Sequence, residues 1–172
     1  MYALKNIIVQ SIEWKTPLFI YFIDFKKAFD SIHRATLWKI VRNNGVSEKI
    51  ETIIKCFYTQ FECSVSLNNK ETDYFAVKSG VRQSCIISPI LFLISIDWVM
   101  KKTTSDSKRG ITWSLFSFLE DIDFADDIAV LSSRQYHMQE KAQRLSHYAS
   151  KLGLHLNTHK TEEMRFNTTS LN

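Results

Sequence analysis

The stretch FLEDIDFADDIAVL, from Phe118 to Leu131, carries two adjacent carboxylates, Asp126 and Asp127, in the middle of an apolar run. Burying an ionised carboxylate without a partner is strongly unfavourable, so such a segment calls for a compensating cation. Two interpretations of the stretch are open. The first is a hairpin with a solvated bend that happens to be acidic. The second is a divalent-metal site whose other ligands lie elsewhere in the chain.

A further acid lies at the end of another strand-like run. The segment LFIYFIDF, from Leu18 to Phe25, is almost continuously β-branched and aromatic, which is typical of a central strand buried on both faces. Asp24 lies near its carboxyl end. A single carboxylate in a buried strand is an oddity. Its recurrence in a second strand favours a cation shared between the two segments.

The composition limits the class of protein. A length of 172 residues suits one domain, and a hydrophobic share of 45% provides a substantial core. The net charge of +4 is only weakly suggestive of an anionic partner. Three cysteines without metal-type spacing fit a reducing compartment better than a disulfide framework. Because the sequence has neither a signal-peptide layout nor a membrane-length apolar run, we expect an intracellular protein of the cytoplasm or nucleus that contacts no membrane.

Hydrophobic periodicity predicts alternating helices and strands. Helices are expected over residues 4–14, from a cap at Asp30 or Ser31 to Gly45, and over 47–57, 89–102 and 135–152. Strands are expected over 18–25, 62–68, 74–77, 111–118 and 124–131, and those over 62–68 and 74–77 are expected to form a hairpin. Two short strand-like pieces, LHLN and KTEEMRF, follow at 154–157 and 160–166. This order fits an α+β layer with helices on one face of a mainly antiparallel sheet. The acids at 120, 121 and 123 are expected to form a solvated turn.

Four motifs that occur in order along the chain resemble the palm of a reverse transcriptase. They are FIDFKKAFD (22–30), SGVRQSCIISPILF (79–92), FADD (124–127) and LGLHLNTHKT (152–161). The AFDS, GVRQ-x-C-x-x-SP-x-LF and GL-x-x-N-x-x-K-T details favour the enzymes of non-LTR (LINE-type) retrotransposons. FADD alone would be a weak signature, whereas four motifs in the family's order are specific and cover nearly the whole chain. The resemblance implies an α+β polymerase palm with a ferredoxin-like or RRM-like core.

The resemblance also implies a reaction, RNA-directed DNA synthesis from dNTPs on an RNA template and a DNA primer. Two Mg²⁺ ions, with Mn²⁺ as a possible substitute, would lie ~3.5–4 Å apart, activate the primer 3′-hydroxyl and neutralise the leaving pyrophosphate. Mg²⁺ takes hard oxygen ligands and keeps several waters, so a few aspartates suffice. Consecutive strand side chains point to opposite faces, so Asp126 and Asp127 can both reach such a site only at a bend.

By the same resemblance, Asp24 and Asp126 are the principal metal ligands and Asp127 is the supporting acid. The backbone carbonyl of Phe25 is a further metal ligand in this family. Lys160 matches a lysine proposed to protonate the leaving pyrophosphate, a role that requires positioning and a suitable pKa. The alternative for Lys160 is an ordinary surface lysine.

Four more residues lie at positions that the resemblance assigns to the nucleotide side of the site. Phe29 corresponds to the ring that lies under the incoming sugar and rejects a 2′-hydroxyl, the alternative being a core aromatic. Gln83 corresponds to a contact with the incoming nucleotide or template, and Arg82 could pair with a phosphate; each could instead be a solvated loop residue. The family has glycine where this chain has Ser84, so we hypothesise reduced activity, because a Cβ is added beside the nucleotide pocket.

We expect one palm domain over residues 1–172, with a remnant of a fingers-side helix at 1–16, the palm core at 17–166 and a tail at 167–172. The chain resembles a fragment without fingers and thumb. One alternative is therefore a truncated, inactive relic that binds nucleic acid weakly, since affinity rests on many phosphate contacts. Another is an unrelated aspartate-rich two-metal phosphohydrolase, which the order of the motifs disfavours. The sequence carries no signature of an oligomeric state.

Overall fold

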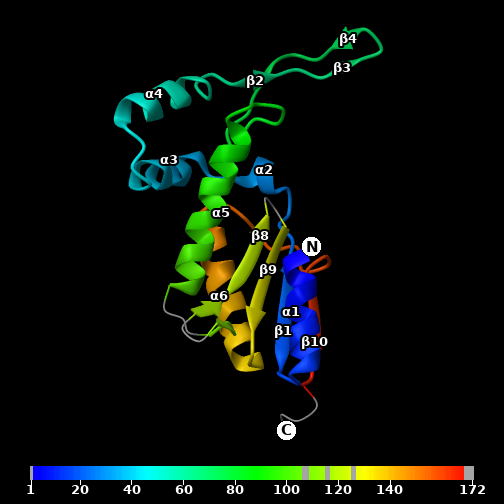
Figure 1. Ribbon diagram of the computed structural model, residues 1–172. Coiled ribbons are helices and arrows are strands. Elements are labelled where there is room, and N and C mark those ends of the chain that lie inside the picture. Colours follow the sequence, from blue (N-terminus) through cyan, green and yellow to red (C-terminus); the bar gives the residue numbers. More distant parts are fainter. Residues whose placement is uncertain (1, 106–108, 115–116, 125–126, 169–172) are drawn as a thin grey trace.

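A four-stranded antiparallel sheet forms the centre of the computed structural model, which describes residues 2–105, 109–114, 117–124 and 127–168. The strand order is β10-β1-β9-β8 (Figure 1). The strands are β1 (Leu18–Ile23), β8 (Asp121–Phe124), β9 (Asp127–Ser132) and β10 (Glu162–Phe166). The expected α+β architecture is confirmed, and β1 is an interior strand, as its continuous apolar sequence predicted.

Helices lie on both faces of this sheet. The main helical layer consists of α5 (Ser88–Thr104) and α6 (Gln135–Lys151), whose buried side chains pack with Phe19, Ile23 and Val130. On the other face, Ile7 of α1 (Tyr2–Glu13) packs with Leu18 and Ile20 of β1 and with residues of β9. The predicted helical layer is present, and α1 is an addition to it. A strand that is apolar on both sides needs cover on both sides.

The two long helices follow their sequence patterns. The helix α5 is apolar on nearly all sides, and Ser95 satisfies its buried hydroxyl by donating to the carbonyl of Leu91 at 2.8 Å. The helix α6 lies where the periodicity predicted a helix, and it buries one side through Met138, Leu145 and Ala149. Within the described ranges, no helix is long and apolar enough to cross a membrane.

The helix predicted to start at Asp30 or Ser31 is instead two helices, α2 (Ala28–Ser31) and α3 (Arg34–Asn43). Asp30 and Ser31 lie inside α2, and His33 precedes α3 without a side-chain capping bond, so the predicted cap is wrong. Tertiary contacts explain the break. The amide of His33 donates to the carbonyl of Leu152 at 2.7 Å, and the carbonyl of Ile32 accepts from Gly80 at 2.8 Å.

Two further expectations fail between residues 111 and 124. The single strand expected over 111–118 is an antiparallel pair, β6 (Ile111–Ser114) with β7 (Ser117–Leu119). The solvated acidic turn is also wrong, because Asp121 and Asp123 lie in β8 and the Glu120 carboxylate pairs with Lys141 of α6. A cation supplied by α6 allows these acids to approach the sheet.

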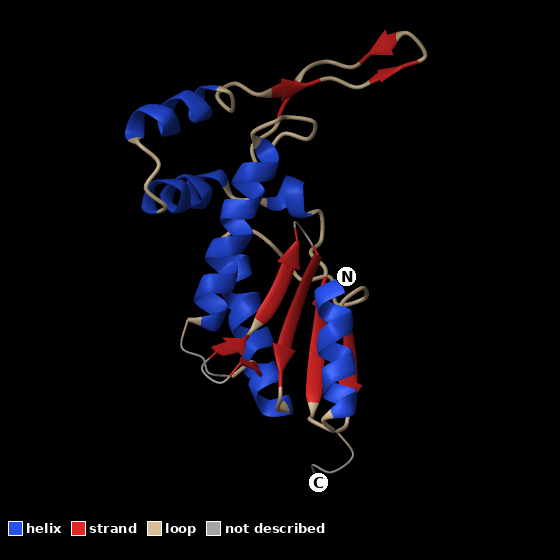
Figure 2. Cartoon of the chain, viewed as in Figure 1, coloured by secondary structure: helices blue, strands red, loops and turns tan. Residues whose placement is uncertain are grey.

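The segment between α3 and α5 projects from the sheet (Figure 2). It contains α4 (Glu48–Cys56) and a ribbon formed by the pairs β2 (Glu62–Cys63) with β5 (Phe75–Ala76) and β3 (Ser66–Leu67) with β4 (Lys70–Glu71). The hairpin predicted from residues 62–68 and 74–77 is confirmed. Asn68 and Asn69 form its turn with φ of 50° and 61°, the left-handed conformation that two-residue hairpin turns require.

Candidate active site

The register between β1 and β9 brings two of the predicted acids together. Ile23 lies opposite Ile128 in the last registered pair, so Asp24, the residue after β1, lies next to Asp127, the first residue of β9. Ile23 and Ile128 both belong to the core under α5 and α6. Because strand side chains alternate, Asp24 and Asp127 share the opposite face of the sheet. Asp24 is half-buried and Asp127 is exposed.

The third predicted acid, Asp126, lies outside the described residues. Phe124 of β8 pairs with Asp127 of β9. Among the described residues, no three His, Cys, Asp or Glu side chains form a cluster that could hold a metal ion. The described part of the site therefore supplies two carboxylates, Asp24 and Asp127, on one face at the end of neighbouring strands.

Residues 155–157 extend the sheet beside Asp24. Phe25 forms an isolated antiparallel bridge with Leu156, and the amide of Lys26 donates to the carbonyl of His155 at 2.8 Å. The amide of Asn157 donates to the carbonyl of Asp24, also at 2.8 Å. The first and the last of the four sequence motifs are thus held together by backbone hydrogen bonds.

Lys160 lies on the same cavity as Asp24. The cavity has a volume of about 920 Å³ and is lined in part by Asp24, Asn157 and Lys160, with Lys26 and Lys27 adding further positive charge. The carbonyl of Asn157 accepts from the amide of Lys160 at 3.0 Å, which forms the turn that carries this lysine. Two residues predicted to act together, Asp24 and Lys160, therefore face a common space.

The SGVRQ loop packs against α2. The amide of Val81 donates to the carbonyl of Phe29 at 2.7 Å. Gly80 has a φ of +76°, and a Cβ there would lie 2.6 Å from that same carbonyl oxygen, so only glycine permits this approach. Gln83 donates from Nε2 to Oδ1 of Asp30 at 3.0 Å. The second motif (79–92) is therefore held against the first (22–30) by hydrogen bonds. The order of the motifs in the sequence does not indicate this contact.

The aromatic and basic side chains predicted for this region make protein contacts. The ring of Phe29 stacks on Phe92 with ring centroids 4.5 Å apart, as a core aromatic does, although Phe29 is only partly buried. The guanidinium of Arg82 lies 4.4 Å from the ring centroid of Phe61 and donates to the carbonyl of Phe57 at 3.4 Å. Both alternatives weighed for Phe29 and Arg82 are compatible with these contacts.

Arg34 is a site residue that sequence reasoning missed. Its guanidinium donates to three backbone carbonyls. The carbonyl of Val77 (2.8 Å) precedes the SGVRQ motif, and those of Ser79 (3.1 Å) and Gly80 (2.8 Å) lie within it. It also lies 5.0 Å from the ring centroid of Tyr58. Partial burial lowers the pKa of this arginine. Its three carbonyl partners lie more than 40 positions away, so no local sequence signal marks it.

We expect Arg34→Lys to lower the free energy of unfolding by about 1–2 kcal/mol, because lysine keeps the charge but cannot reproduce the planar fork that serves three carbonyls. Urea unfolding would measure the change. Arg82→Lys is the matched control, since Arg82 has one long hydrogen bond to a carbonyl, and a change within about 0.5 kcal/mol is expected there. Equal losses in the two variants would contradict the role assigned to Arg34.

Ser84 adopts the left-handed conformation that glycine prefers, with a φ of 60°. For a residue with a Cβ, this conformation costs roughly 1–2 kcal/mol of stability. Glycine avoids that cost, but its more flexible unfolded chain loses more entropy on folding, which offsets part of the gain. We therefore expect Ser84→Gly to raise the free energy of unfolding by about 0.5–1 kcal/mol. Thermal unfolding would check it against Ser47→Gly, where φ is −62° and no gain is expected. The hypothesis that Ser84 reduces activity stays a prediction.

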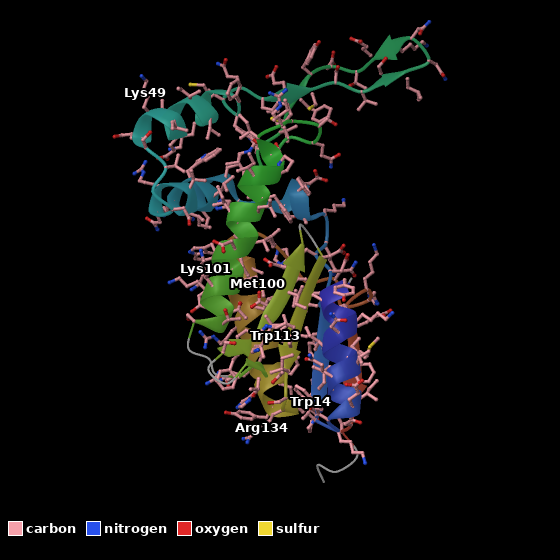
Figure 3. The ribbon with its side chains drawn as sticks, in the orientation of Figure 1. Trp14, Lys49, Met100, Lys101, Trp113 and Arg134 are labelled. Atoms are coloured by element: carbon pink, nitrogen blue, oxygen red, sulfur yellow. The ribbon has the colours of Figure 1, made fainter. Side chains whose placement is uncertain are left out.

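Another cavity, of about 570 Å³, lies at the far end of β1. It is lined by Trp14, Leu18 and Trp113, among others, and Figure 3 shows the two tryptophans at the end of the sheet away from α2. The strand β1 begins at this cavity and ends before Asp24. Six residues of strand span ~20 Å, so the tryptophan cavity is separate from the candidate active site.

Comparison with known proteins assigns the fold and the family. The model of the family "Reverse transcriptase (RNA-dependent DNA polymerase)" matches residues 7–171. The retrovirus-related Pol polyprotein of retrotransposable element R2 from Popillia japonica is 23% identical over 148 residues, which are 86% of this chain and 24% of that protein. The retrovirus-related Pol polyprotein of the type-2 retrotransposable element R2DM from Drosophila melanogaster is 24% identical over 138 residues, which are 80% of this chain and 13% of that protein. This chain thus spans a quarter or less of these two relatives.

Solved structures of telomerase share the fold. Apo telomerase from Candida tropicalis superposes with a TM-score of 0.70 and 15% identity, over 95% of this chain and 32% of that one. Telomerase of the same organism in complex with a fragment of telomeric RNA gives a TM-score of 0.70 and 16% identity, over 96% and 29%. Because the family model matches residues 7–171, nearly the whole of this chain, the chain belongs to the reverse transcriptase (RNA-dependent DNA polymerase) family.

Proposed function

We propose that this chain is the palm of an RNA-directed DNA polymerase from a non-LTR retrotransposon, and that it joins dNTPs to a primer 3′-hydroxyl on an RNA template inside the cell. The observation that carries the proposal is the pairing of β1 with β9, which sets Asp24 beside Asp127 on one face. The cavity that Lys160 shares with Asp24 supports it further. Residues 1–16 would be the fingers-side helix and residues 17–166 the palm core.

The donor set fits the divalent cation that the family implies. Carboxylate oxygens are the ligands that Mg²⁺ prefers, and Mg²⁺ needs few of them because it keeps water. We propose that Asp24, Asp126, Asp127 and the carbonyl of Phe25 would hold two Mg²⁺ ions, with Mn²⁺ as a substitute. When bound, the ions would activate the primer hydroxyl and neutralise the pyrophosphate.

The chain's own residues have separable roles in this proposal. Lys160 would hold the proton that the leaving pyrophosphate takes up, from its place on the Asp24 cavity. Phe29 would exclude a 2′-hydroxyl from the incoming sugar. Arg82 and Gln83, with the backbone at Ser84, would contact the nucleotide or template. The Asp30 carboxylate, which accepts from Gln83, would orient that amide.

A primer-extension assay tests the proposal. The wild-type chain should extend a DNA primer on an RNA template only with Mg²⁺ or Mn²⁺, and Asp24→Asn and Asp127→Asn should both reduce extension to background. Asp73→Asn, an exposed position in the projecting ribbon, is the control and should keep wild-type extension. Extension that survives Asp24→Asn would contradict the metal assignment. A folded wild-type chain without extension would identify an inactive relic, and cleavage without synthesis would identify a phosphohydrolase.

A further inference from the structure

We propose that Asn157 is a positioning residue that holds the Asp24 carboxylate in the orientation in which it binds the divalent cation, an inference that rests on the function proposed above. The side-chain Nδ2 of Asn157 donates to Oδ2 of Asp24 at 2.9 Å. Both side chains are half-buried and line the same cavity. The contact links residues 133 positions apart. The sequence motif contains Asn157 but gives no indication of its partner.

The segment 157–161 holds Asp24 through three different groups. Asn157 donates to the Asp24 carboxylate through its side chain and to the Asp24 carbonyl through its backbone amide, the latter at 2.8 Å. The amide of Asp24 donates to Oγ1 of Thr161 at 3.4 Å. With backbone and side chain both engaged, the carboxylate is restrained in rotation. Within the described ranges, no hydrogen bond reaches the other carboxylate oxygen, Oδ1, so that oxygen is left for a cation.

The chemistry of asparagine suits this task. A lysine or arginine at position 157 would neutralise the carboxylate and compete with a metal ion, whereas an aspartate would add repulsion. An amide donates a hydrogen bond without bringing a charge. Removing a partner that orients a metal ligand in this way typically lowers metal affinity or activity about 10–100-fold. Asn157 therefore orients Asp24 and leaves its charge in place.

Asn157 also connects Asp24 to Lys160 through its backbone. Its carbonyl accepts from the amides of Lys160 at 3.0 Å and of Thr161 at 2.8 Å. These bonds do not involve the side chain of Asn157, so Asn157→Ala removes the contact with the carboxylate and retains the donors and acceptors of the turn. The variant thus separates the orientation of Asp24 from the placement of Lys160.

Binding of Mn²⁺ to the full chain, measured by electron paramagnetic resonance of the free ion, tests this inference without requiring catalysis. We expect Asn157→Ala to weaken Mn²⁺ binding by about tenfold. Asn167→Ala is the matched control, because Asn167 is also half-buried and its Nδ2 donates to the carbonyl of Ser11 at 2.7 Å, near the start of β1. It should lose stability while keeping wild-type Mn²⁺ affinity.

The possible outcomes separate this inference from the proposed function. Wild-type affinity in a folded Asn157→Ala variant would overturn the role of Asn157 and leave the metal site standing. An affinity that Asp24→Asn does not change would overturn the metal site, and this inference with it. If Asn157→Ala does not fold, the side-chain amide resonance of Asn157 in the wild-type chain decides. It should shift when Mg²⁺ is added, whereas that of Asn167 should not, and an unmoved Asn157 resonance would overturn the inference.

Discussion

Replacing Lys141 with alanine is expected to lower the free energy of unfolding by about 3–5 kcal/mol, the range found when one partner of a buried ion pair is removed. The side chain of Lys141 is 1% exposed, and it pairs with the Glu120 carboxylate, which is 13% exposed. Its Nζ also donates to the carbonyl of Leu131 at 2.6 Å and to that of Glu120 at 3.3 Å. Alanine would leave a buried carboxylate and two carbonyls without this donor.

The control for this variant is the same substitution at an exposed ion pair. Lys101 lies 2.8 Å from Asp97, with side chains 71% and 47% exposed, on the outer surface of α5 (Figure 3). Lys101→Ala should change the free energy of unfolding by less than about 1 kcal/mol. The double variant Lys141→Met with Glu120→Gln removes both charges, so it should recover more than half of the loss. Guanidinium unfolding would measure all three, and equal losses at Lys141 and Lys101 would rule out a buried pair.

The second large effect is a gain in stability at Asp121. Burial and, to a smaller extent, the neighbouring Asp123 carboxylate together raise the pKa of this carboxyl from 3.8 to about 6. A raised pKa means that the folded state disfavours the ionised form. A shift of about two units corresponds to a penalty of roughly 3 kcal/mol at neutral pH. We therefore expect Asp121→Asn to raise the free energy of unfolding at pH 7 by about 1–3 kcal/mol.

The pH dependence of this effect has a definite sign. Above about pH 6 the Asp121 carboxylate is ionised in both states and the penalty is fully present; below pH 3.8 it is protonated in both and the penalty is absent. The advantage of Asp121→Asn over the wild type should therefore shrink as the pH falls from 7 to 4. Urea unfolding at several pH values would show it, with the exposed Asp73→Asn as the control. An advantage that does not depend on pH would contradict the burial of a charged Asp121.

The sequence predicted the elements whose patterns are local. These elements are β1, α5 and α6. The spacing of apolar residues within each of them indicates which of its residues are buried. The neighbourhood of Asp24 and Lys160 was also predicted, but only through the family resemblance, because residues far apart in the chain form it. The proximity of Asp24 to Asp127 follows from strand register, which no local pattern specifies.

The wrong predictions have a common physical cause. In each case, residues distant in the sequence supply the hydrogen bonds or the charge that we expected a neighbouring residue or water to supply. Asp30 was expected to cap a helix, but Gly80 and Leu152 bond the backbone at that break. The acids near 120 were expected to need water, but Lys141 supplies a cation. A signal for that cation existed, since Lys141 follows Met138 by three positions and so faces the sheet with it. Arg34 had no such signal.

The placement of β1 between β9 and β10 has a consequence for how the chain emerges from the ribosome. Both neighbours of this strand are made long after it, because β9 starts at Asp127 and β10 at Glu162. Until then β1 offers two unpaired edges and the apolar face that α5 and α6 later cover, which is the kind of surface that aggregates during synthesis. The strand therefore stays unpaired until β9 and β10 have been synthesised, and Asp24 cannot lie beside Asp127 until β9 has docked.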